Sequence, residues 1–154
     1  MAFTRTLAVA AFTALSATFI APQQLLAAPV VQQTRLPNGL TVVVKEDHRA
    51  PSVVHMVWYQ VGAMDEVDGS SGLAHALEHM MFKGTPKVGP GRFNQIVAAE
   101  GGRDNAFTSL DYTAYFQQVP AKALRKMMTL EADRMRNLRV SEAEFSKEIE
   151  VIKE

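Results

Sequence analysis

Two histidines and a glutamate in one short stretch constrain this 154-residue chain more than any other feature. The stretch is His75-Ala76-Leu77-Glu78-His79. Each residue of a helix turns about 100°, so in a helix His75, Glu78 and His79 would share one face. Zinc binds imidazole nitrogens at about 2.0–2.1 Å, and a histidine pair four positions apart can supply two ligands from one side. A neighbouring carboxylate can then move a proton from water to a leaving amine. The pattern predicts half of a zinc hydrolase site.

The flanking residues favour a helix across this stretch. Residues 68–72 form a polar, glycine-containing loop with candidate N-cap side chains. Residues 73–82 include good helix formers and no proline. Lys83-Gly84-Thr85-Pro86 is typical of a helix end, with glycine at the C-cap and proline beyond it. We expect a short capped helix whose core contacts are Leu77, Met80 and Met81.

A histidine pair that binds no metal is the alternative interpretation. The chain has 4 histidines, which are His48, His55, His75 and His79. With so few, the spacing H-x-x-E-H should arise by accident only about 0.01 times in a chain of this length. We expect His55 to be a packed residue of a strand.

The amino-acid composition limits which partners and which metal ligands this chain can have. Lys plus Arg and Asp plus Glu both total 16, so no basic excess indicates a nucleic acid partner. The chain has 0 cysteines, which excludes disulfides, thiolate ligands and a cysteine nucleophile. Zinc would have to be held by histidine and carboxylate, a donor set that favours a catalytic site over a structural one.

The N-terminus has the pattern of a secretory signal. Arg5 precedes an apolar run that extends to Ala21, and small residues lead to a cleavage point after Ala27 or Ala28. A membrane anchor is the alternative, but the run is short for a span and lacks a strong charge after it. We therefore expect a signal peptide over residues 1–28 and a mature segment, 29–154, in the periplasm or outside the cell.

The remaining elements alternate between strand and helix patterns. A hairpin is predicted over residues 34–45 around Pro37-Asn38-Gly39, with residues 30–33 as a lead-in. Further strands are predicted over residues 53–61, 105–109 and 111–119. Further helices are predicted over residues 93–100 and 121–138, and a last helix starts from a capping box at Ser141.

The helix over 121–138 has an apolar stripe at helical spacing. Its members are Leu124, Met127, Met128, Met135 and Leu138. Glu131 falls on the stripe, where a carboxylate is unfavourable unless it is paired. Arg134, Arg136 and the metal site are all possible neighbours.

The last helix reaches Glu154 without a glycine, a proline or a polar tail. We expect it to continue, so that the domain is truncated at its C-terminal end.

Several segments together resemble one family. Residues 72–85, Gly-Leu-Ala-His-Ala-Leu-Glu-His-Met-Met-Phe-Lys-Gly-Thr, are similar to the signature of the pitrilysin/insulinase zinc peptidases, whose inverted motif is H-x-x-E-H. Residues 36–40, 101–113 and 145–154 resemble further family segments in the same order. The resemblance covers residues 34–154.

The resemblance implies roles for individual residues. His75 and His79 would be zinc ligands and Glu78 the general base. The third ligand is a glutamate about seventy-five residues downstream, which is either Glu154 or the residue after it. Glu148 would match a second acidic residue near the site.

The resemblance also implies a fold and a place for the substrate. The family fold is an α+β sandwich in which helices pack on a mixed β-sheet, and this chain would be part of its first domain. Asn105 and Ala106 would lie on an edge strand where an extended peptide docks. Asn105 as a simple turn residue is the alternative.

The function expected is that of a zinc-dependent metalloendopeptidase acting on peptides or polypeptides in an exported compartment. A second homologous half or subunit is implied, whereas no nucleic acid and no stable membrane anchor are expected. The alternatives are a non-catalytic partner subunit or peptide-binding homologue, and an inactive truncated fragment of the enzyme.

Overall fold

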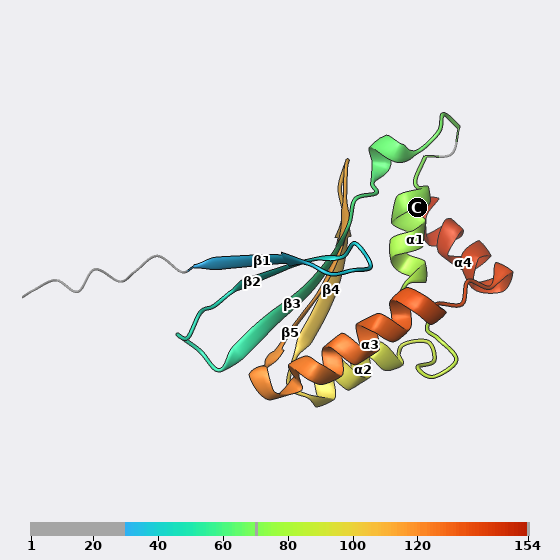
Figure 1. Ribbon diagram of the computed structural model, residues 1–154. Coiled ribbons are helices and arrows are strands. Elements are labelled where there is room, and N and C mark those ends of the chain that lie inside the picture. The colour runs from blue at the N-terminus through green and yellow to red at the C-terminus, as the bar shows by residue number, and fades with distance from the viewer. Residues whose placement is uncertain (1–29, 70, 154) are drawn as a thin grey trace, which may run out of the picture. The chain divides into compact units, whose positions relative to one another are not determined.

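The computed structural model describes residues 30–69 and 71–153 (Figure 1). Their contacts group into two units, one ending at Asp47 and one starting at His48. The predicted signal peptide and Glu154 lie outside the described residues. No helix within the described ranges has the length and apolarity needed to cross a membrane.

The first unit contains a single hairpin. Strands β1 (Val31–Arg35) and β2 (Thr41–Lys45) pair antiparallel, as the Pro-Asn-Gly turn predicts. Gly39 has φ 89°, a left-handed conformation that glycine adopts without strain. Strand β1 begins before the predicted strand, because the ladder continues past Thr34 until Val31 pairs with Lys45.

The sheet of the second unit has the strand order β3-β5-β4. Its strands are β3 (Ser52–Tyr59), β4 (Arg103–Thr108) and β5 (Thr113–Pro120). The α+β class is confirmed, although every strand pairing in the described part of the chain is antiparallel, where a mixed sheet was expected. Strand β4 is at an edge of this sheet.

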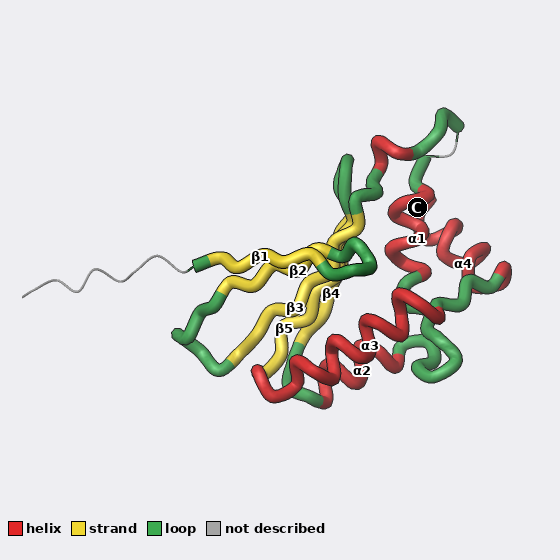
Figure 2. Tube along the Cα trace, in the orientation of Figure 1, coloured by secondary structure: helices red, strands yellow, loops and turns green. Residues whose placement is uncertain are grey.

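Three helices of the second unit lie on one side of the β3-β5-β4 sheet (Figures 1 and 2). They are α1 (Leu73–Met80), α2 (Arg92–Ala99) and α3 (Leu124–Asn137). Helix α4 (Glu142–Lys153) packs against α1, and short 3₁₀ turns occur at Ala63–Asp65 and Ala121–Ala123. The main hydrophobic cluster joins α2, β5 and α3 through Phe93, Val97, Val119, Ala123 and Met127. The apolar periodicities therefore predicted the helices within a few residues.

The expected apolar stripe of α3 is only partly buried. Met127 is fully buried, but Met128 and Met135 are 53% and 46% exposed, so their assignment to the core was wrong. Leu77 on α1 is also exposed, at 48%. The buried positions of α3 include Glu131 and Arg134 instead.

Glu131 and Arg134 form a buried ion pair. The Arg134 Nη2 donates to both carboxylate oxygens of Glu131, at 2.8 and 2.6 Å. The guanidinium also lies 4.4–5.1 Å from the ring centroids of Phe82, Phe93 and Tyr115. Such cation–π contacts stabilise a desolvated guanidinium. One side chain of α3 thus contacts β5, α2 and the residues that follow α1.

A polar chain extends from this pair into the sheet. The Gln117 amide donates to Glu131 at 3.2 Å, and its oxygen lies 2.8 Å from Nδ1 of His55. Because that oxygen can only accept, Nδ1 of His55 carries the proton. His55 is a packed strand residue in this structure.

Replacing Arg134 by alanine should destabilise the protein strongly, because it leaves the Glu131 carboxylate buried without its partner. We expect a loss of about 3–5 kcal/mol in the free energy of unfolding. Urea denaturation measures it.

The matched control is Arg136→Ala, which removes the same side chain from an exposed position of the same helix. It should change the free energy of unfolding by less than about 0.5 kcal/mol. Equal effects of the two changes would contradict the importance of the buried pair.

Candidate metal centre

Helix α1 brings the imidazoles of its two histidines together. Nε2 of His75 and Nε2 of His79 are 3.2 Å apart, and the rings are perpendicular. His75 is exposed, whereas Glu78 and His79 are half-buried. Two ring nitrogens therefore converge at a point that solvent can reach.

The spacing of these nitrogens fits one zinc ion. Two nitrogens 3.2 Å apart, each about 2.0–2.1 Å from a metal, subtend an angle of about 99–106° at it. This is close to the tetrahedral angle that zinc adopts in most protein sites. The pair needs little rearrangement to act as two ligands.

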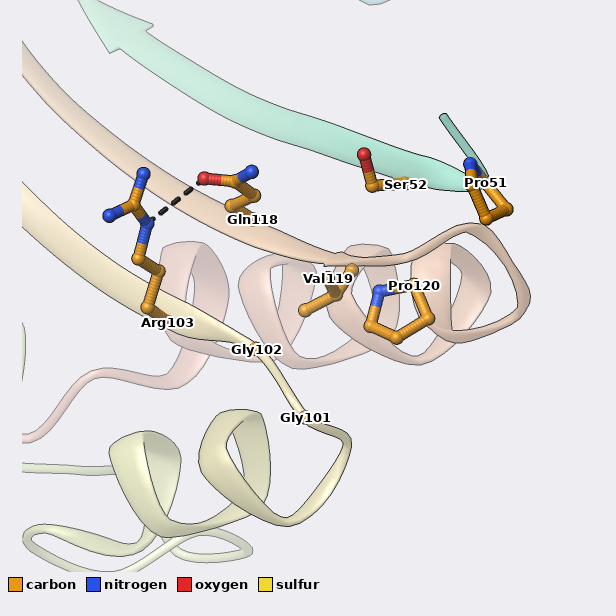
Figure 3. Close-up of a pocket in the computed structure, with 8 residues that line it drawn as sticks. All are labelled: Pro51, Ser52, Gly101, Gly102, Arg103, Gln118, Val119 and Pro120. Atoms are coloured by element: carbon orange, nitrogen blue, oxygen red, sulfur yellow. Dashed lines mark hydrogen bonds between the residues drawn. The ribbon is translucent and has the colours of Figure 1, made fainter. Parts of the chain in front are cut away.

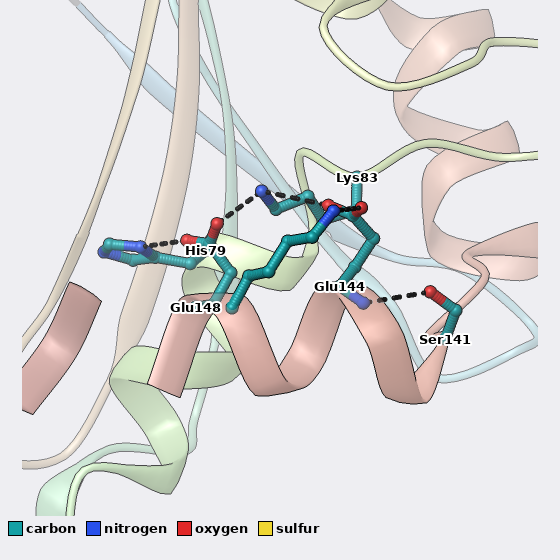
Figure 4. A network of polar contacts seen from close by, with 6 residues as sticks. His79, Lys83, Ser141, Glu144 and Glu148 are labelled. Carbon is teal, nitrogen blue, oxygen red and sulfur yellow. Dashed lines mark hydrogen bonds and ion pairs between the residues drawn. The ribbon is translucent and has the colours of Figure 1, made fainter. Parts of the chain in front are cut away.

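A carboxylate orients the second imidazole. Oε2 of Glu148, on α4, lies 2.8 Å from Nδ1 of His79 (Figure 4). The ionised carboxylate accepts, so Nδ1 carries the proton and the Nε2 lone pair faces His75. Metal-binding histidines commonly have such a carboxylate partner.

Lys83 fixes this carboxylate from the other side. Its ammonium donates to Oε1 of Glu148 and lies 3.4 Å from Glu144, one turn earlier on α4 (Figure 4). The hydrogen bond from Lys83, followed by that from His79, lowers the pKa of Glu148 below its usual range. The carboxylate therefore stays ionised and available to His79.

Glu78 faces the sheet. Its Oε2 accepts a hydrogen bond of 2.6 Å from the hydroxyl of Thr108, the last residue of β4. Sequence reasoning gave Thr108 no role, because nothing within its own strand distinguishes it from other strand threonines.

Glu66 fixes the start of α1. The N-cap position is Gly72, which has no side chain with which to cap the helix. The Glu66 carboxylate instead accepts hydrogen bonds of 2.8 Å from the backbone N–H groups of Gly72 and Ala74. These bonds, that from Ala74 first, lower the pKa of Glu66. The sequence contained no signal for this contact, since N-cap signals are sought at the adjacent residue.

The third ligand is not placed by the structure. Glu154 lies outside the described residues, and within 30–69 and 71–153 no three His, Asp or Glu side chains are grouped so as to hold a metal. The assignment of Glu154 or its successor stays a prediction.

The predicted peptide-docking residues are in edge strand β4. Asn105 is exposed on the face away from the helices, while Ala106 is half-buried on the helix side. Asn105 is therefore a strand residue and not a turn residue. Their role in binding peptide stays a prediction.

An open hollow of about 480 Å³ lies at the other end of the sheet (Figure 3). Its lining comes from the start of β3, the start of β4 and the end of β5. None of the predicted site residues lines it.

Comparison with known proteins identifies the family of this chain. Residues 41–154 match the family model described as Insulinase (Peptidase family M16). The chain belongs to this family of peptidases, which confirms the resemblance to pitrilysin and insulinase.

Individual relatives are longer than this chain. It is 39% identical to the zinc protease PqqE of Helicobacter pylori over 127 residues, which are 82% of this chain and 29% of that protein. It is 34% identical to a probable mitochondrial-processing peptidase subunit beta of Arabidopsis thaliana, in a match that covers 83% of this chain and 24% of that protein. It is 33% identical to subunit 1 of the cytochrome b-c1 complex of Rattus norvegicus, in a match that covers 90% of this chain and 28% of that protein. The chain thus spans less than a third of each relative.

A solved structure has the same fold. The crystal structure of a protease from Helicobacter pylori superposes with a TM-score of 0.78 at 39% sequence identity. The match covers 80% of this chain and 30% of that one.

Replacing Glu66 by glutamine should lower stability in a pH-dependent way. The folded pKa of Glu66 is lowered, so its stabilising effect is complete above the unfolded pKa of about 4.5 and is lost as the pH falls through the folded pKa. We expect Glu66→Gln to unfold at a lower temperature at pH 7, and the difference from the unchanged protein to disappear toward pH 3.

Asp68→Asn is the control, since it removes the same charge from the same loop. A stability difference for Glu66→Gln that persisted unchanged at low pH would argue against capping by the carboxylate.

Replacing Glu148 by alanine should weaken zinc binding by about 10–100-fold, because His79 loses the carboxylate that orients it. Titration with a competing chelator measures the affinity. Glu144→Ala, one turn away on the same helix and in contact with Lys83 but not with His79, should have a much smaller effect. Similar losses in both variants would exclude a specific role for Glu148.

Proposed function

We propose that this chain is the first catalytic domain of a zinc-dependent metalloendopeptidase. His75 and His79 are its zinc ligands and Glu78 is its general base. The observation that carries the proposal is the 3.2 Å approach of the two Nε2 atoms on a helix face that also presents Glu78. Membership in a family with zinc protease relatives supports it.

The chemistry follows from the donor set. Zinc, when bound, polarises the scissile carbonyl and acidifies a water. Glu78 takes a proton from the attacking water and returns it to the leaving amine. Glu148 keeps the proton of His79 on Nδ1, so that Nε2 remains a ligand.

The substrate proposed is an extended peptide. Strand β4 pairs with β5 on one side only in the three-stranded sheet, and Thr108 at its end contacts Glu78. A peptide that added to this edge at Asn105 and Ala106 would lie beside the general base.

The complete site needs more than the described residues. We propose that the third ligand is Glu154 or the residue that follows it. The relatives are about three to four times longer, and one is named as a subunit of a processing peptidase. A second homologous half or subunit is therefore proposed to complete the active enzyme, and the isolated chain is expected to be inactive.

The proposed location is the periplasm or the exterior of the cell. Its support is the signal-peptide pattern over residues 1–28. Mass spectrometry of the exported protein tests this, because the mature chain should begin at Ala28 or Pro29.

Glu78→Gln should reduce peptide cleavage by about 10²–10⁴-fold in the intact polypeptide, because glutamine cannot accept the proton. Zinc content should stay at the unmodified level. His75→Ala should lose both zinc and cleavage. Glu142→Gln, an exposed change on α4, is the control that should alter neither.

The same measurements separate the alternatives. Stoichiometric zinc without cleavage in the intact polypeptide would indicate a non-catalytic partner subunit. One relative is named as subunit 1 of the cytochrome b-c1 complex. Cleavage by the intact polypeptide but not by the 154-residue chain would identify the chain as an inactive fragment. Undiminished cleavage in Glu78→Gln would show that Glu78 is not the base.

A further inference from the structure

We propose that Thr108 is a positioning residue for catalysis, whose hydroxyl holds the Glu78 carboxylate in its working orientation. The inference rests on the proposed function, since it assumes that Glu78 is the general base. It concerns a residue of β4 that does not lie in the histidine helix and to which the sequence motif assigns nothing.

The direction of the hydrogen bond follows from the groups involved. The Thr108 hydroxyl lies 2.6 Å from Oε2 of Glu78, and an ionised carboxylate can only accept. The single hydroxyl proton of Thr108 is therefore committed to Glu78. The neighbouring Thr113 hydroxyl donates to the backbone oxygen of Val61 at 2.9 Å, and its contact with Thr108 is longer, at 3.4 Å.

The donor itself is held in place. Thr108 pairs with Thr113 at the end of the β4–β5 ladder, and the turn is closed by a bond from Ser109 N–H to the Tyr112 oxygen. A β-branched side chain in a strand has few χ1 rotamers, so the hydroxyl has a defined direction.

The turn is also attached to the segment that precedes α1. The N–H groups of Ala63 and Met64 donate to the oxygens of Ser109 and Leu110, at 3.1 and 2.7 Å. A Cβ on Gly62 would come within 2.5 Å of both oxygens, so the backbones are in close contact. Thr108 therefore has a rigid support.

The bond supplies an orientation that α1 alone does not. The terminal torsion of a glutamate is broad, so a free carboxylate would rotate and its side chain would sample several rotamers. With Oε2 bound to Thr108, Oε1 would be the carboxylate oxygen that accepts the proton of the attacking water. The benefit appears in the chemical step and not in substrate binding.

The test compares Thr108→Val with Thr108→Ser in the intact polypeptide loaded with zinc. Valine keeps the shape and the strand preference but has no hydroxyl, whereas serine keeps the hydroxyl and fits a strand less well. We expect valine to lower kcat by about tenfold to a hundredfold, as for a lost hydrogen bond to a charged group, with KM changed less than about twofold. Serine should restore most of kcat.

A purely structural role predicts the opposite order, with serine more damaging than valine. A readout independent of activity is the crystal structure of metal-free Thr108→Val, in which the Glu78 carboxylate should no longer have one defined position. Zinc stoichiometry and melting temperature should stay close to those of the unmodified protein. Thr113→Val is the matched control, and it should lower stability without the drop in kcat.

Failure of this inference differs from failure of the proposed function. In a Glu78→Gln background, Thr108→Val should have no further effect on residual cleavage. If Glu78→Gln is inactive while Thr108→Val retains full kcat, the positioning role is wrong and the proposed function stands. If Glu78→Gln remains active, the proposed function itself is wrong.

Discussion

The buried guanidinium of Arg134 is the interaction on which the arrangement of the second unit depends. Its charge is balanced by Glu131 on the same helix, and its flat faces lie among rings from β5, α2 and the residues after α1. Desolvating an ion pair is unfavourable unless the geometry is good and the remaining polar atoms have partners. Here the carboxylate receives bonds from Arg134 and Gln117, whereas Nη1 of Arg134 is buried without a hydrogen-bond partner among the described residues. The pair therefore defines how α1 and its neighbours meet the sheet.

From this support, the histidine helix is held at three points along its length. Glu66 accepts bonds from N–H groups at its start, while Thr108 and Glu148 bind the adjacent residues Glu78 and His79 in its last turn. Each contact comes from a different segment, so no single loop determines the position of the face that carries His75, Glu78 and His79. Fixed geometry of this kind is what a metal-assisted proton transfer requires, because small displacements of the reacting groups slow it greatly.

Much of this could be predicted from local patterns. The helical period places His75, Glu78 and His79 on one face without any knowledge of the fold. The same period favours Arg134 over Arg136 as the partner of Glu131: a step of three residues turns about 300°, which returns to the same side, whereas a step of five turns about 140°. The prediction of a buried apolar stripe on α3 was wrong for Met128 and Met135. Both residues fit the helical spacing, but they are exposed in the described part of the chain.

The contacts of Glu66, Thr108 and Lys83 could not be predicted in this way. Each joins residues through a side chain whose partner is set by tertiary packing, between 6 and 65 positions away in the sequence. A lone threonine in a strand is typical of strand propensity, and only the neighbouring helix reveals its bond to Glu78. The residues proposed to carry the chemistry could thus be named from the chain, whereas of the residues that contact them only Glu148 was expected near the site.

Helix α4 differs from its neighbours in how it is attached. None of its described side chains is fully buried, whereas α2 and α3 each contribute to the core. Its Glu148 forms ionic contacts with His79 of α1 and with Lys83, which follows α1. Segments with little buried apolar surface open at a lower free energy than the rest of a protein. Local opening of α4 would therefore separate Glu148 from His79 while the β3-β5-β4 sheet stays folded.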